Sequence, residues 1–133
     1  YGLLAVGAKV AVCGPPTLIP RDIESLGVKV YSDLDEAIAK SDVLNVLRIQ
    51  MERQDSGLFP SIREYHQTFG VTSERLESAN KKLTILHPGP INRGLELDAD
   101  VADGPHSVIL QQVTNGVAVR MAILYLIAGG DEL

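Results

Sequence analysis

Two short polar segments carry side chains that could bind a small anion, and the first begins at Arg48. Arg48 directly follows the apolar run 42–47, which predicts a buried strand, so its guanidinium would emerge where that strand ends. A guanidinium matches a carboxylate or a phosphate with two parallel hydrogen bonds. Gln50 would point the same way in an extended chain, and Glu52 could orient Arg48 from behind. The alternative is a solvated loop that carries charges of both signs.

The second segment is His87-Pro88-Gly89-Pro90, which directly follows the apolar run 83–86. Its two prolines restrict φ, and Gly89 allows the backbone to come close to a ligand. The carbonyl oxygens of such a loop could hold the amide of a substrate, and one of its X-Pro bonds could be cis. The alternative is a turn that only ends a strand, with His87 in a structural role.

These segments must be positioned by the elements around them. Strand patterns over residues 9–13, 28–31, 42–47 and 83–86 alternate with helical patterns over 20–26, 33–40, 61–69, 74–79 and 107–128. The alternation predicts an α/β fold, a three-layer sandwich with a parallel, Rossmann-like sheet of about four strands. We expect Ser32 to cap the second helix and Thr72 or Ser73 the fourth. Right-handed crossovers between parallel strands place the exits at Gly14-Pro15-Pro16, Arg48 and His87 on one edge, and ligands bind at that edge of such sheets.

The composition argues against several other classes of function. The net charge is −5 and no cluster of Lys and Arg occurs, so nucleic acid is not an expected partner. No apolar stretch reaches the roughly 18 residues that span a bilayer. Cys13 is the only cysteine and is predicted to be a small core residue, which makes a reducing cytoplasm the default setting. No metal-ligand spacing and no glycine-rich nucleotide fingerprint is present, so we expect neither a metal site nor a nucleotide site.

In chain order these segments resemble the aspartate/ornithine carbamoyltransferase family. Residues 12–20 (VCGPPTLIP) look like the first strand exit of its carboxy-terminal domain, and residues 47–53 (LRIQMER) resemble its Arg-Val-Gln-Lys-Glu-Arg motif. Residues 86–94 (LHPGPINRG) are similar to its His-Pro-Leu/Gly-Pro motif, and residues 111–120 (QQVTNGVAVR) look like the start of its last helix. Ornithine-specific members carry Ser-Met-Gly where this chain has residues 48–50, and Arg48 would favour an anionic over a cationic substrate. The resemblance is therefore to the aspartate-specific members.

The resemblance implies transfer of a carbamoyl group from carbamoyl phosphate to the amine of L-aspartate, in pyrimidine synthesis and without a cofactor. It implies that Arg48 and Gln50 bind aspartate, that Glu52 orients Arg48, and that the backbone of Gly89 and Pro90 binds the carbamoyl amide. It assigns no catalytic residue to this chain. Met51 stands where the family motif has lysine, and Arg93 lies two residues later than the arginine of some members, so neither role is carried over.

The resemblance also implies that much of the site lies elsewhere. Residues 1–133 would be the aspartate-binding domain, without the amino-terminal domain that carries the Ser-Thr-Arg-Thr-Arg phosphate motif. The family works as a trimer whose neighbouring subunit completes each site, and regulatory or dihydroorotase subunits are possible further partners. We therefore expect the isolated chain to fold and to be inactive. The apolar segment 117–127 is expected to meet a second domain or subunit.

Two other functions stay open at this point. One is a carbamoyltransferase of another amino-acid specificity, of the ornithine type. The other is a non-catalytic binding module on the same fold, which would never have been joined to a phosphate-binding domain.

Overall fold

The computed structural model describes residues 1–51, 61–79 and 82–129 of the chain. Helices and strands alternate along most of this length, which confirms the α/β class. In chain order the elements are α1 (Gly2–Ala5), β1 (Ala11–Cys13), the 3-10 turns η1 (Pro16–Leu18) and η2 (Ile23–Leu26), β2 (Lys29–Tyr31), α2 (Leu34–Ala39), β3 (Val43–Asn45), α3 (Ile62–Phe69), α4 (Ser73–Leu76), β4 (Thr84–Leu86), α5 (Ala99–Ala102) and α6 (Ile109–Ile127).

The strands form two parallel pairs, where we expected one sheet of about four strands. β1 pairs with β2, and β3 pairs with β4 with Val43 opposite Thr84 and Asn45 opposite Leu86. Each strand is three residues long, so few backbone groups are available to join the pairs into one ladder. Side-chain packing brings the pairs together instead, because Cys13 of β1 and Leu44 of β3 both pack against the same core cluster.

The strands are also less buried than their apolar sequences indicated. Val43 of β3 is 56% exposed, and among the four strands only β4 holds a fully buried side chain, that of Ile85. The reason is that β4 has neighbours on both of its edges. It pairs with β3 on one side, and on the other Ile85 exchanges backbone hydrogen bonds with His106 and Val108.

Short polar caps begin the helices at the expected places, with one correction. Asp33, and not Ser32, caps α2, because its carboxylate accepts hydrogen bonds from the backbone N–H groups of Asp35 and Glu36 at 2.8 and 3.1 Å. Thr72 caps α4 as expected, although this helix ends at Leu76 and is shorter than the predicted range 74–79. The predicted loop between β4 and the last helix contains the short helix α5.

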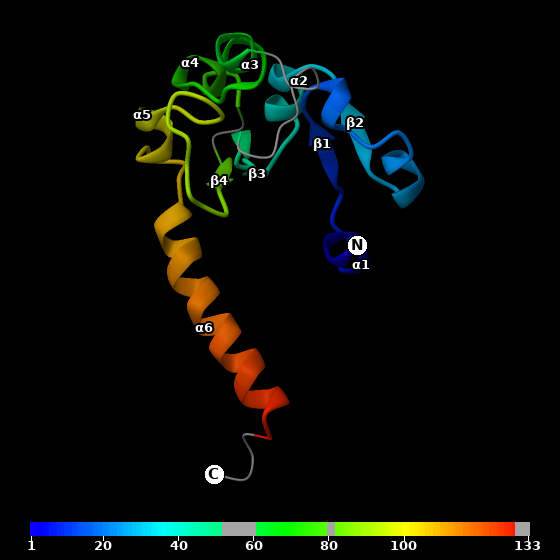
Figure 1. Cartoon of the computed structure of the whole chain (residues 1–133), viewed down its shortest axis with the longest axis vertical. Coiled ribbons are helices and arrows are strands. Elements are labelled where there is room, and N and C mark those ends of the chain that lie inside the picture. Colours follow the sequence, from blue (N-terminus) through cyan, green and yellow to red (C-terminus); the bar gives the residue numbers. More distant parts are fainter. Residues whose placement is uncertain (52–60, 80–81, 130–133) are drawn as a thin grey trace.

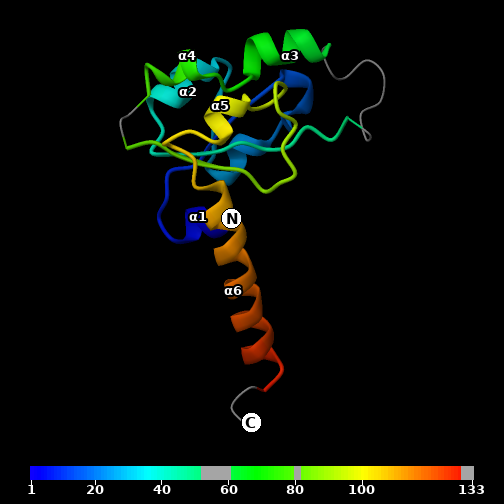
Figure 2. The same cartoon turned by 90° about the vertical axis from the view of Figure 1, so that its left-hand side faces the viewer.

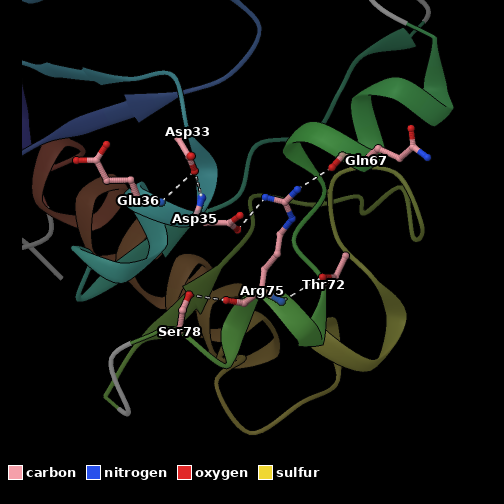
Figure 3. A network of polar contacts seen from close by, with 7 residues as sticks. All are labelled: Asp33, Asp35, Glu36, Gln67, Thr72, Arg75 and Ser78. Carbon is pink, nitrogen blue, oxygen red and sulfur yellow. Dashed lines mark hydrogen bonds and ion pairs between the residues drawn. The ribbon is translucent and has the colours of Figure 1, made fainter.

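Arg75 connects three of these helices (Figure 3). Its guanidinium donates to the Asp35 carboxylate of α2 at 2.8 Å and to the Gln67 carbonyl of α3 at 2.6 Å. The hydroxyl of Thr72 accepts from the Arg75 backbone N–H at 3.3 Å. Only a fifth of the Arg75 side chain is exposed, so solvent weakens its hydrogen bonds little. The guanidinium of this α4 residue therefore fixes α2, α3 and α4 relative to one another.

The core lies around β4 and the segment that precedes α6. Leu97 is completely buried, and its neighbours Glu96 and Asp98 bond through their backbones to Val71 at 3.0 Å each. The core cluster consists of Leu34, Ile38, Val46, Val71, Leu83, Ile85, Leu97, Val101, Ala102 and Ile109. It therefore joins α2, β4, α5 and the first residue of α6.

Beyond its first turns, α6 leaves this body as a single projecting rod (Figures 1 and 2). Ile109 is buried, whereas Leu124, Leu126 and Ile127 are 67 to 79% exposed. The glycine of Asn115-Gly116 does not interrupt it, since the helix is continuous from Ile109 to Ile127. Within the described ranges, no helix is both long enough and apolar enough to cross a membrane.

Candidate functional site

The parallel pairing of β3 and β4 brings two of the predicted segments to one edge. Asn45 lies opposite Leu86 at the ends of the two strands, and the N–H of Val46, the next residue, donates to the Leu86 carbonyl at 2.9 Å. The chain continues from there into Arg48 on one side and into His87 on the other. The third predicted exit, Gly14-Pro15-Pro16, follows β1 in the other strand pair and enters η1.

A side-chain hydrogen bond joins the two segments directly. The amide Nδ2 of Asn92 donates to the backbone carbonyl of Ile49 at 2.8 Å. Ile49 lies between Arg48 and Gln50, and both of these side chains are half-buried. The Met51 N–H also donates to the Ile49 carbonyl at 3.1 Å, which closes a tight turn. Glu52, expected to orient Arg48, lies outside the described residues.

After the buried His87, residues Pro88, Gly89 and Pro90 form a bent and exposed loop. The Gly89–Pro90 peptide bond is cis, as expected for one X-Pro bond of this segment. Gly89 has a φ of 68°, in the left-handed region where glycine is preferred, and nothing lies within 4 Å of a Cβ added there. The backbone of Gly89 and Pro90 is thus open to a ligand.

Beneath this loop, His87 is completely buried and bonded on three sides. Its Nδ1 accepts from the Gly89 N–H at 2.8 Å, and its Nε2 lies 3.2 Å from Oε1 of Glu96. Its backbone N–H donates to the side-chain oxygen of Gln112 in α6 at 2.9 Å. Glu96 is also completely buried, and its Oε1 accepts from the Asn92 N–H at 2.7 Å.

The sequence analysis missed Glu96, Asn92 and Gln112. Glu96 did carry a signal, because an acid between two leucines, Leu95 and Leu97, in a segment that supplies core residues needs a partner. Asn92 and Gln112 carried none, since asparagine and glutamine are common in loops and on helix surfaces. Only the fold shows that they contact the two segments.

The other two histidines and Arg93 are bonded in ways that suit a structural role. His66 contacts Asp98 at 2.9 Å, His106 contacts the Leu83 carbonyl at 3.0 Å, and Arg93 forms a two-pronged pair with Asp103. No cluster of His, Cys, Asp and Glu that could hold a metal occurs in the part of the chain that the structure describes.

Cys13 is half-buried against the core cluster, close to its predicted role as a small core residue. Burial raises the pKa of its thiol, the negative charge of Asp33 raises it further, and the positive charge of Arg75 partly opposes them. Because only the thiolate is strongly nucleophilic, this environment makes Cys13 a poor nucleophile.

An open hollow of about 510 Å³ lies between the end of β4 and the first turns of α6. Leu86 forms part of its wall, and Gln112, Asn115 and Arg120 line it from the helix. Since Gln112 also holds the backbone of His87, the hollow adjoins the loop that carries Gly89 and Pro90.

Comparisons with known proteins agree on one family. The model of the aspartate/ornithine carbamoyltransferase family, Asp/Orn binding domain, matches residues 1–127. The chain is 62% identical to the aspartate carbamoyltransferase catalytic subunit of Gemmatimonas aurantiaca over 98% of its own length and 41% of that protein. It is 60% identical to the catalytic subunit of Halothermothrix orenii over 98% of its length and 42% of that protein. The chain thus spans about two-fifths of the relatives that it matches.

Solved structures give the same result. Aspartate transcarbamoylase from Trypanosoma cruzi, in complex with carbamoyl phosphate, superposes with a TM-score of 0.73 at 30% identity, over 89% of this chain and 40% of that one. Ornithine carbamoyltransferase from Burkholderia thailandensis has a TM-score of 0.74 at 23% identity, over 93% of this chain and 40% of that one. At that identity the second match shows the fold alone.

Proposed function

Because the chain belongs to the aspartate/ornithine carbamoyltransferase family, we propose that it supplies the aspartate-binding half of an aspartate carbamoyltransferase site. The reaction is transfer of the carbamoyl group of carbamoyl phosphate to the amine of L-aspartate, a step of pyrimidine biosynthesis. The carbamoyl carbon gains a bond to the aspartate nitrogen, the bond to the phosphate oxygen breaks, and the amine loses a proton. The products are carbamoyl-aspartate and phosphate.

The observation that carries the proposal is the junction of the two strand exits. The Asn92–Ile49 hydrogen bond holds the segment of Arg48 and Gln50 against the segment of Gly89 and Pro90. An amino acid held by its carboxylates at Arg48 and Gln50 would lie beside a carbamoyl group held by the backbone of Gly89 and Pro90. Placing two substrates next to each other is itself a large part of catalysis in such a transfer.

Arg48 selects the amino-acid substrate in this proposal. Aspartate has a side-chain carboxylate that a guanidinium can bind with two hydrogen bonds, whereas the ammonium of ornithine would be repelled by it. Relatives about 60% identical to this chain are named as aspartate enzymes, which supports the same choice.

The charges that stabilise the leaving phosphate come, in this proposal, from protein outside the 133 residues. The parent chain would act as a homotrimer in the cytoplasm, and regulatory or dihydroorotase subunits are possible partners. Sedimentation of the complete parent chain tests the trimer. The coding sequence upstream of Tyr1 tests whether a phosphate-binding domain precedes this one.

The test of function uses a chimaera in which this chain replaces the matching two-fifths of the Gemmatimonas aurantiaca catalytic subunit. We expect the chimaera to form carbamoyl-aspartate and the isolated chain to form none. Arg48→Met should raise the KM for aspartate about 10- to 100-fold, since a hydrogen bond to a charged group contributes about 1.5–3 kcal/mol. The KM for carbamoyl phosphate should change little.

Arg63→Met is the matched control, because Arg63 is an exposed arginine on α3. It should leave both KM values unchanged. A chimaera that prefers ornithine, or an Arg48→Met variant that binds aspartate normally, would contradict the assignment of substrate. Turnover by the pure isolated chain would contradict the division of the site between two domains.

A further inference from the structure

Glu96 is a buried carboxylate in a position where stability alone favours an apolar residue. It is completely buried between Leu95 and Leu97, whose side chains are buried as well. Its Oε1 accepts two hydrogen bonds, while Oε2 is buried without a hydrogen-bond partner among the described residues. A buried acceptor that makes no hydrogen bond lowers stability. A buried polar group of this kind calls for an explanation other than filling the core.

The hydrogen bonds of His87 determine how its ring is protonated. The Gly89 N–H can only donate, so Nδ1 must accept and carries no proton. The ring proton is therefore on Nε2, which donates to Oε1 of Glu96 at 3.2 Å. Glu96 thus fixes the tautomer and the orientation of His87, and His87 in turn holds the backbone of Gly89.

A second connection leads from the same oxygen to the other segment. Oε1 of Glu96 also accepts from the backbone N–H of Asn92 at 2.7 Å. That bond fixes Asn92, whose side chain donates to the Ile49 carbonyl between Arg48 and Gln50. Oε1 of Glu96 therefore holds both segments of the candidate site. It holds the Gly89–Pro90 loop through the ring of His87, and the Arg48–Gln50 segment through the backbone N–H and the side-chain amide of Asn92.

We propose that Glu96 is the positioning residue of this site, acting on the Gly89–Pro90 loop through His87 and on the Arg48–Gln50 segment through Asn92. The inference rests on the proposed function, because it assigns these two segments to carbamoyl phosphate and to aspartate. It goes further in stating that the two substrate subsites are aligned by a common buried group. Glu96, His87 and Asn92 touch neither substrate.

The two connections predict separate kinetic effects, which a purely structural role would not produce. His87→Gln keeps a donor near the Nε2 position for Glu96 but loses the acceptor for Gly89. It should raise the KM for carbamoyl phosphate about fivefold, which corresponds to the roughly 1 kcal/mol of one hydrogen bond, and leave the KM for aspartate within about twofold. His87→Asn keeps an oxygen near the Nδ1 position, accepts from Gly89, and should restore most of that loss.

The other connection is broken by Asn92→Leu, which has a similar shape but no donor for the Ile49 carbonyl. It should raise the KM for aspartate about tenfold with little change for carbamoyl phosphate. Glu96→Ala removes the common acceptor and should raise both KM values. His66→Asn is the control, because it breaks another histidine–carboxylate pair, that of His66 with Asp98, which includes no residue of the two segments.

The variants are compared in the active chimaera, with urea unfolding measured on each. The proposal is overturned if His87→Gln and Asn92→Leu raise both KM values equally, or if every effect follows the loss of stability as in His66→Asn. It is also overturned if ring nitrogen shifts measured by NMR on the 133-residue chain place the His87 proton on Nδ1. If the unmutated chimaera transfers no carbamoyl group, the proposed function fails. The positioning role of Glu96 can still be tested then, because faster amide hydrogen exchange at Gly89 and Asn92 in Glu96→Ala would show that Glu96 holds these two residues in place, and unchanged exchange would show that it does not.

Discussion

Two apolar regions of this molecule, the surroundings of β4 and the second half of α6, end in opposite environments. Ile85 of β4 is completely buried, whereas Leu126 of α6 is 70% exposed. β4 is covered because the chain returns to it twice, through β3 and through the segment that leads into α6. The second half of the helix carries Arg120 and is otherwise apolar nearly all round, and the helix projects from the body (Figure 1). The sequence thus shows which residues are apolar, and only the path of the chain shows which of them are buried.

The largest test of this contrast is a pair of truncations. Ile85→Ala should lower the free energy of unfolding by about 2–5 kcal/mol, because it removes buried methyl groups and leaves a cavity. Leu126→Ala should change it by less than about 0.5 kcal/mol, as is usual for an exposed position. Urea unfolding of both variants measures the difference. Equal losses would mean that the second half of α6 is packed in solution.

A second test concerns the tight junction between α3 and the segment before α5. A Cβ added at Gly70 would lie 2.5 Å from the His66 carbonyl oxygen and 3.1 Å from that of Leu95. Both are backbone atoms, so Gly70→Ala should destabilise the fold by about 1–3 kcal/mol. Gly14→Ala is the control, because nothing lies within 4 Å of its added Cβ. Thermal unfolding measures both variants. Equal unfolding midpoints for Gly70→Ala and Gly14→Ala would show that the backbone around Gly70 is less tightly packed than these distances indicate.

A third test uses pH on the buried side of the contrast. Burial of the hydroxyl, followed by the negative charges of Glu96 and Cys13, raises the pKa of Tyr65 from 10.0 to about 12. The folded state therefore resists ionisation, and its stability is full below about pH 10 and is lost as the pH rises through about 12. The loss attributable to Tyr65 is about 2 kcal/mol over this range.

Phenylalanine has no hydroxyl to ionise, so Tyr65→Phe should not lose this free energy of unfolding at high pH. Its stability relative to the unmutated chain should therefore rise as the pH is raised. Urea unfolding at neutral pH, at about pH 10 and at about pH 12 measures the difference between the two proteins. Parallel curves for the two proteins would show that Tyr65 is not buried in solution.

The smallest effect on stability is expected on α6 itself. Replacing Leu124 and Leu126 by Gln should leave the free energy of unfolding unchanged within about 0.5 kcal/mol, because both side chains are exposed. The same change should reduce concentration-dependent self-association, since an exposed apolar surface of this kind promotes contact with other molecules. Sedimentation at several concentrations measures it. A lower free energy of unfolding would contradict the exposed position of the helix.

Much of the local structure could be predicted from residue types. The helix over Ile62–Phe69 follows from a Ser61 cap and an amphipathic pattern, and its end at Gly70 was expected. The cap of α2 was predicted one residue too early, because Ser32 and Asp33 are both good caps and only the fold shows which one reaches the free N–H groups. The sheet was predicted as one, because strand patterns do not say which strands pair.

The candidate site divides in the same way. Arg48, Gln50, Gly89 and Pro90 could be selected because their residue types and their places after predicted strands indicate binding, and their roles stay predictions. Glu96 and Asn92 could not be selected, because their importance comes from contacts that they make in the fold. The bond from Asn92 to Ile49 joins residues 43 positions apart, and no local pattern encodes such a contact.

The sequence by itself therefore determined the α/β class, the positions of most helices and strands, and the two segments that follow β3 and β4. These properties depend on propensities, caps and apolar periodicity, which act over a few residues. Tertiary structure decided which strands pair, which apolar surfaces are covered, and how one buried carboxylate joins the two segments. Those properties depend on the desolvation of groups that are distant in the chain, and burial is known only when the whole fold is in place.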